Sequence, residues 1–295
     1  MSKSKKFLIN STKLALAGSL LIFLSSCTLQ KPSFKDGQIA QKIKEAVKEG
    51  LREEPVIRMT DNVLYIYIPV ARDVLRIIRA QGNLSEKEPE ADSFHTFSSD
   101  YKDNIFVVRY TTKKFPPTES FYKNITFNFT PHVQNIQRRV TNILHGITGD
   151  IPEKIDFFVI IVADIYGGIE IKQTMYKTDF KRSAVGALPW MEFNKRVLVE
   201  VRGDTEIMRD VRGSHIDYKN IELPDFIADI LIYNLSQKRE FKEEKYTDYI
   251  QKVFYRIVTD YDFENYRYLL LEDPMNEKET ILFPFDIKKK FEKPN

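Results

Sequence analysis

Apolar positions recur at helical and at strand spacing along most of the chain, and the two spacings come in clusters. Ile39, Ile43 and Val47 are four residues apart, which predicts a helix on one apolar face. Residues 56–68 predict a β-hairpin, because two apolar runs flank a Thr-Asp-Asn turn. Residues 71–81 place apolar side chains on one helical face and arginines opposite, and therefore predict a second helix.

The strongest strand signal lies near the middle of the chain. Residues 157–162 are apolar on both faces and predict a central strand that is covered on both sides. Residues 169–175 alternate apolar and polar side chains, and predict the half-exposed partner of that strand in a hairpin. Further strands are predicted at 105–111, 122–129, 196–202, 206–211, 216–223, 266–271 and 280–285, and further helices at 131–146, 224–235 and 243–261. Because strands and helices do not alternate strictly, we expect an α+β fold with helices packed on a largely antiparallel sheet.

A polar stretch divides this pattern. Residues 82–104 are acidic and have no apolar periodicity, so they predict a flexible loop or linker. The boundary separates a small N-terminal αββα module, residues 36–81, from a main α+β domain at 105–295.

The first 26 residues follow another pattern. Four lysines and no acidic residue accompany Leu14–Leu24, a stretch without any charge. A membrane-spanning helix needs about 20 apolar residues, so this stretch is too short and is typical of an export signal.

Residues 24–27, Leu-Ser-Ser-Cys, follow that stretch directly and resemble the lipobox of bacterial lipoproteins. The resemblance covers only the export segment. It implies that the Cys27 thiol is joined to diacylglycerol, that residues 1–26 are removed, that the new N-terminus is acylated, and that 27–35 form a lipidated tether. Thr28 stands where an aspartate would mark retention at the inner membrane, which implies the outer membrane, facing the periplasm, in a Gram-negative host. An ordinary cleaved signal or an uncleaved anchor is the alternative.

Composition agrees with export. The chain has one cysteine, the residue that the lipid would occupy, so the domain must fold without disulfides. Lys+Arg 45 against Asp+Glu 42 gives a formal net charge of +3, but the export segment carries that excess. No basic stripe supports nucleic-acid binding, and no glycine-rich phosphate loop indicates a nucleotide, so we expect no cofactor.

Two sets of residues are candidates for catalysis. Asp164 and Glu170 lie near the ends of the predicted central hairpin, where paired carboxylates would suit glycoside hydrolysis. His215 lies between Ser214 and Asp217. Serine, histidine and aspartate are the residue types of a hydrolase triad. Neighbours on one strand point to opposite faces, however, so a triad from these three residues is not expected.

Metal binding is not predicted. The four histidines show no pair at four-residue helical spacing with a glutamate between them. Asp204, Glu206, Asp210 and Asp217 gather acidic charge without the spacing of a calcium loop.

Aromatic residues predict a binding surface. Tyrosines crowd the C-terminal region, and Tyr266 and Tyr268 are the candidates outside its helices. Trp190 is the single tryptophan of the chain, and we expect it in a loop.

The sequence therefore favours a membrane-anchored envelope lipoprotein that works as a non-enzymatic binding or assembly factor. Its expected partners are the membrane, through lipid on Cys27, and an envelope protein. Two alternatives are a hydrolase of envelope polymers and the solute-binding lipoprotein of a transporter, which usually has two lobes of alternating strands and helices.

Overall fold

The computed structural model describes residues 37–51, 53–79, 93–114, 125–147, 149, 151–236 and 246–291. The export segment, the lipobox and the tether lie outside the described residues, as do residues 82–92 of the predicted loop.

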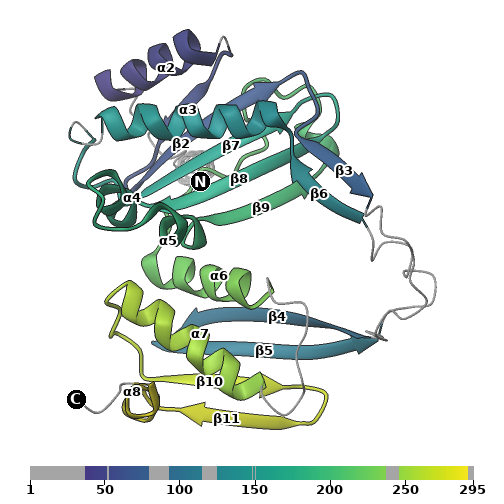
Figure 1. Cartoon of the computed structure of the whole chain (residues 1–295), viewed down its shortest axis with the longest axis vertical. Helices are drawn as coiled ribbons and strands as arrows, with labels where there is room; N and C mark the ends of the chain where they lie inside the picture. Colours follow the sequence, from purple (N-terminus) through teal and green to yellow (C-terminus); the bar gives the residue numbers. More distant parts are fainter. Residues whose placement is uncertain are drawn as a thin grey trace, which may run out of the picture. The chain divides into compact units, whose positions relative to one another are not determined.

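A five-stranded sheet has the strand order β1-β2-β7-β8-β9 (Figure 1). β7 (Phe157–Asp164) is its central strand and is buried at every position, as the apolar run predicted. β2 (Val63–Val70) pairs with it in parallel, and β8 (Ile169–Tyr176) pairs with it antiparallel. β1 (Val56–Met59) and β9 (Leu198–Gly203) form the edges.

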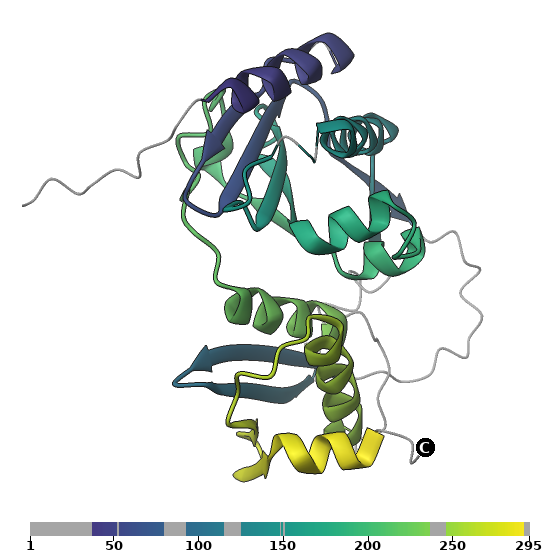
Figure 2. The same ribbon diagram turned by 90° about the vertical axis from the view of Figure 1, so that its left-hand side faces the viewer.

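Four helices accompany this sheet: α2 (Gln38–Leu51), α3 (Pro131–Ile147), α4 (Lys177–Ala184) and α5 (Trp190–Lys195). α2 and α3 lie on one face of the sheet (Figures 1 and 2). Their apolar side chains pack with the even-numbered residues of β7. The four-residue spacing in α2 is thus explained by burial, because it directs one stripe of side chains at the sheet. A two-stranded sheet of β3 (Leu75–Arg79) and β6 (Ile125–Phe129) completes this part.

The second sheet has the strand order β11-β10-β5-β4. Its strands are β4 (Ser93–Lys102), β5 (Ile105–Lys114), β10 (Tyr268–Asp273) and β11 (Lys278–Leu282). α8 (Pro284–Phe291) follows the last strand.

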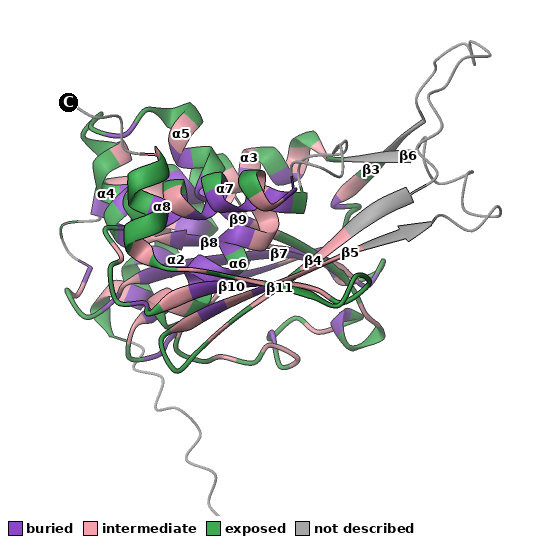
Figure 3. Cartoon of the chain, turned by 90° about the horizontal axis from the view of Figure 1, so that it is seen from below, coloured by how far each residue is buried: buried purple, intermediate pink, exposed green. Residues whose placement is uncertain are grey.

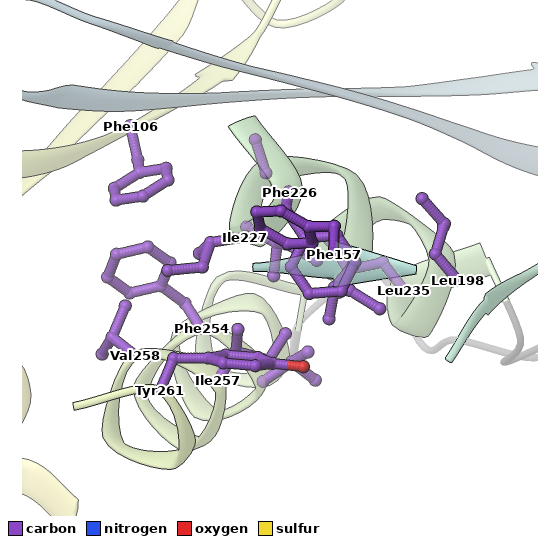
Figure 4. Packing of buried hydrophobic residues seen from close by; sticks show 14 of the residues in the cluster. Phe106, Phe157, Leu198, Phe226, Ile227, Leu235, Phe254, Ile257, Val258 and Tyr261 are labelled. Carbon is purple, nitrogen blue, oxygen red and sulfur yellow. The ribbon is translucent and has the colours of Figure 1, made fainter. Parts of the chain in front are cut away.

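One apolar core joins the two sheets through α6 (Leu223–Ser236) and α7 (Tyr246–Asp260). The ring of Phe226 on α6 lies 5.2 Å from that of Phe157 in the first sheet. On α7, Phe254 lies 5.1 Å from Phe106 in the second sheet (Figure 4). Distances are between ring centroids. β7 therefore has a core on each of its faces, since its odd-numbered side chains join this cluster.

The α+β fold class is confirmed. Most strand pairs are antiparallel, and the two parallel pairs are β2 with β7 and β5 with β10. Among the described helices, none combines the length and the apolar character that crossing a bilayer would require.

Several elements of the structure differ from those that the sequence predicts. The helix predicted over 71–81 is wrong, because residues 75–79 form β3 and take their backbone hydrogen bonds from β6. The predicted loop ends earlier than expected, since β4 occupies 93–102 and pairs along its whole length with β5. Residues 36–81 are also not separate from the rest, because β2 from this stretch pairs with β7.

Candidate functional site

A segment without helix or strand, residues 208–222, links a short 3₁₀ turn (Thr205–Ile207) to α6. We call it the strap (Figure 2, the green segment that leads to α6). The strands predicted over 206–211 and 216–223 are therefore not formed.

The strap is bonded to β2 and to the turn before it. The Tyr65 hydroxyl donates to the carbonyl of Lys219 at 2.7 Å, and the Tyr67 hydroxyl donates to the carbonyl of Asp210. The Asn62 amide donates to the carbonyl of Ile221 at 2.8 Å. These bonds supply the strap with backbone partners that a strand would have obtained from a sheet.

His215 lies at the centre of the site. Its Nδ1 is 2.6 Å from Asp210 Oδ2, and its Nε2 is 2.8 Å from Glu170 Oε2. Asp210 comes from the strap and Glu170 from β8, so the imidazole joins the strap to the first sheet. The three side chains are 3%, 11% and 7% exposed, in the order His215, Asp210, Glu170.

This geometry favours the imidazolium form. A carboxylate oxygen faces each ring nitrogen, and both bonds are satisfied only if both nitrogens carry a proton. Burial lowers the pKa of His215, but the hydrogen bonds to Glu170 and Asp210 outweigh it, and the pKa is raised. Burial raises the pKa of Asp210, but bonds from His215 and from the Arg212 amide outweigh it, and that pKa is lowered.

The surroundings of the cluster are polar on one side and aromatic on the other. Burial, followed by the charges of Asp210 and Glu170, raises the pKa of Tyr67. Arg202 binds Asp204 through Nη2, and this bond is the main reason why the pKa of Asp204 is lowered. The net charge of the three bonded groups is negative, so a cation at His215 is required to hold the carboxylates together.

The sequence predicted two of these residues as candidates but not their arrangement. Asp164 does not join Glu170, because Glu170 lies opposite Ala163, and side chains of adjacent strand residues point to opposite faces. Asp164 instead accepts bonds from the amides of Tyr166 and Gly167, each at 2.9 Å, and shapes the turn after β7. The candidate carboxylate pair at the hairpin is therefore not formed.

The triad suggested by Ser214, His215 and Asp217 is also not formed. The side chain of Asp217 is 83% exposed and faces Lys219 at 3.6 Å. Asp210, the actual partner, lies five residues before His215, and no motif distinguishes it in the sequence.

The predicted binding residues separate into two groups. Tyr266 is buried in the core, and Tyr268 is half-buried with its ring 6.1 Å from that of Phe283, so neither is an open platform. Trp190 is the first residue of α5 and not in a loop, and it is 53% exposed.

Among the described residues, no group of three or more His, Cys, Asp or Glu side chains has a geometry that could hold a metal ion. Asp204 and Glu206 both bond to Arg202. In the histidine cluster the two carboxylates lie on opposite sides of the ring, so they cannot share an ion.

Two surface grooves are lined in part by the strap. One, of about 730 Å³, runs beside α2 and β1, and another, of about 470 Å³, lies between β8, β9 and the start of α6. Neither is lined by Glu170, Asp210 or His215. The buried imidazole therefore does not open into either groove.

A second buried ionic network stabilises the helices after β8. Arg196 is 9% exposed, and its Nη1 lies 3.1 Å from Asp179 Oδ1 while its Nη2 lies 2.8 Å from Asp260 Oδ1. The guanidinium also lies 6.0 Å from the centre of the Tyr261 ring. Burial raises the pKa of Asp179, with Arg196 opposing it. This network ties α4 to the end of α7.

Replacing Gly213 by Ala is expected to destabilise the strap by about 1–3 kcal/mol. Gly213 has φ +64°, and an added Cβ would lie 2.5 Å from the Tyr218 hydroxyl. Gly186→Ala is the matched control, because its φ is +74° and nothing lies within 4 Å of its Cβ. Urea denaturation measures the free energy of unfolding of both variants, and it separates backbone strain from the clash with Tyr218. Equal losses of stability in the two variants would contradict a tightly packed strap.

The site as a whole is a buried carboxylate–imidazolium–carboxylate cluster that fixes the strap on the sheet. Neither ring nitrogen of His215 is available to take a proton from a substrate, because each is already hydrogen-bonded to a carboxylate. The chain has no match among family models, curated proteins or solved structures.

Proposed function

We propose that this chain is a bacterial envelope lipoprotein, anchored by lipid on Cys27, whose domain binds or assembles a partner and does not catalyse a reaction. In a Gram-negative host it would face the periplasm from the outer membrane. The observation that carries the non-enzymatic part is the closed cluster of Glu170, His215 and Asp210. A general base must reach its substrate, and this imidazole is buried with both nitrogens engaged.

The anchoring part of the proposal comes from residues 24–27 and the uncharged stretch before them. The hydrolase alternative is weaker, because Asp164 and Glu170 lie on opposite faces of the sheet. The transporter alternative expects two lobes of alternating strands and helices, and the described strands instead form hairpins with two parallel pairs.

Cys27→Ala is expected to abolish acylation of the chain. The wild-type chain should float with membranes, and mass spectrometry should find acyl chains on a mature N-terminus at Cys27. Ser26→Ala is the matched control, since it keeps a small residue before the cysteine and should leave attachment intact. A wild-type chain that stays in the membrane with residues 1–26 still attached and without acyl chains would instead identify an uncleaved anchor.

Crosslinking in intact envelopes tests the binding role. We expect the wild-type chain to be crosslinked to a defined envelope protein. Turnover of an envelope glycan by the purified chain, abolished by Glu170→Gln, would contradict the non-enzymatic proposal.

A further inference from the structure

Helices α4 and α5 meet at a corner that exposes large apolar side chains. We define the α4–α5 corner as residues 181–195. Val185, Trp190 and Met191 are 80%, 53% and 77% exposed there. Burial would be expected for side chains of this size, so a group of three within seven residues indicates a contact surface.

The corner has a fixed shape. Phe180, Leu188 and Phe193 are buried beneath it and belong to the core on the α2 and α3 face of the sheet. The Leu188 amide donates to the carbonyl of Arg182 at 3.1 Å, and the ring of Trp190 lies 5.4 Å from that of Phe193. Figure 3 shows α5 mainly green at the surface. The exposed side chains are therefore presented by a packed support.

The charges of the corner are mainly positive. Lys181, Arg182 and Lys195 are exposed, and the side chains of the last two are 48% and 58% exposed. Glu192 is the single acidic residue of the corner, and it accepts a bond from Lys195 at 3.2 Å. The corner therefore combines exposed apolar side chains with an excess of cations.

The apolar surface of β11 and α8 differs in charge. Phe283 and Phe285 are 53% and 72% exposed there. Glu277, Glu279 and Asp286 are exposed around them among lysines. Mixed charge of this kind does not favour an anionic partner, so this surface provides a comparison within the same chain.

We propose that the α4–α5 corner contacts a bilayer that contains anionic lipid, with Trp190, Val185 and Met191 at the boundary between headgroups and acyl chains. Lys181, Arg182 and Lys195 would then meet lipid phosphates. Tryptophan favours the membrane interface because its ring is apolar and its N–H is polar, and basic residues beside apolar ones are typical of surfaces that lie on a bilayer. This inference rests on the proposed function, since lipid on Cys27 would keep the domain beside such a surface.

The single tryptophan makes the test direct, because tryptophan fluorescence of the full chain reports the corner alone. The full chain purified from membranes is mixed with vesicles of phosphatidylcholine, with or without about a third of phosphatidylglycerol. We expect a blue shift and quenching by brominated acyl chains in the anionic vesicles, and a smaller effect in the neutral ones. Added salt should reduce the difference.

Charge variants distinguish the corner from the rest of the surface. Lys181→Glu with Lys195→Glu should lower vesicle partitioning of the Trp190 signal about tenfold or more. Lys278→Glu with Lys289→Glu changes the net charge equally on the other surface and should leave the signal unchanged. Met191→Ser should weaken quenching, whereas Phe285→Ser should not.

Flotation of the vesicles, measured in the same samples, keeps the two proposals apart. Flotation without any change in Trp190 emission would contradict membrane contact by the α4–α5 corner, but it would agree with lipid anchoring at Cys27. A Trp190 shift in Cys27→Ala together with flotation equal to that of the wild-type chain would support the corner and count against the anchor. A shift that needs an added envelope protein and no lipid would overturn the membrane contact in favour of a protein interface.

Discussion

His215→Gln is expected to lower the free energy of unfolding at pH 7 by about 3–5 kcal/mol. The substitution removes the cation that bonds Glu170 at 2.8 Å and Asp210 at 2.6 Å, and leaves two buried carboxylates facing a neutral side chain. His132→Gln is the matched control, because His132 is 27% exposed and lies 3.8 Å from Glu53. That change should lower the free energy of unfolding by less than about 0.5 kcal/mol. Urea denaturation measures both.

The pH dependence provides a second readout. His215 has a folded pKa above the unfolded value of about 6.5, so its contribution is fully present below that pH and is lost as pH rises through the folded pKa. The groups that face it are Glu170 on β8, Asp210 on the strap, Asp204 after β9 and Tyr67 on β2. The wild-type chain should therefore lose stability on the alkaline side.

This alkaline loss should be absent from His215→Gln. Its stability should instead increase as pH falls, because burial raises the pKa of Asp210 once the bonds from His215 are gone, and its protonation relieves the repulsion. Equal pH profiles for the wild-type chain and the variant would show that the imidazolium does not hold the strap.

Arg196→Met is expected to destabilise the domain by a similar amount, about 3–5 kcal/mol. Methionine fills much of the same space but leaves Asp179, which is 4% exposed, without its main cation. Arg182→Met is the matched control, because Arg182 lies 4.0 Å from the same carboxylate but is 48% exposed. An exposed pair of this kind contributes about 0–1 kcal/mol.

Rescue separates the lost charge from lost packing. Adding Asp179→Asn to Arg196→Met should recover much of the stability, because the carboxylate that then lacks Arg196 is Asp260, which is 24% exposed and can be solvated. Lower pH should also rescue the single variant. Its Asp179 pKa should rise further above the unfolded value of about 3.9, so stability returns as pH falls through it. Failure of both rescues would assign the loss to packing around Tyr261.

Local patterns predicted the elements whose apolar stripe faces a core. α2 and α3 were predicted from residues spaced by three and four, and β7 from an apolar run, because burial against a sheet requires those spacings. β3 was mistaken for a helix, since a short apolar run fits both periods and its pairing with β6 decides the outcome. β4 was mistaken for a loop because it is polar, although β5 satisfies its backbone.

The candidate site shows the same division. Glu170 and His215 could be recognised as chemically capable, but they are 45 residues apart and their contact is not encoded by any spacing. Asp210 was not singled out for His215, because its role depends on how the strap crosses β2.

By itself the sequence determined the periodic helices and strands, the lipobox resemblance and the types of residue available for chemistry, since each is a local property of the chain. Only the tertiary structure decided that Glu170 and Asp210 enclose His215, that Asp164 faces away, and that Trp190 stands on an exposed corner. The physical reason is that sheet order and strand register bring distant residues together, and these depend on packing of the whole domain.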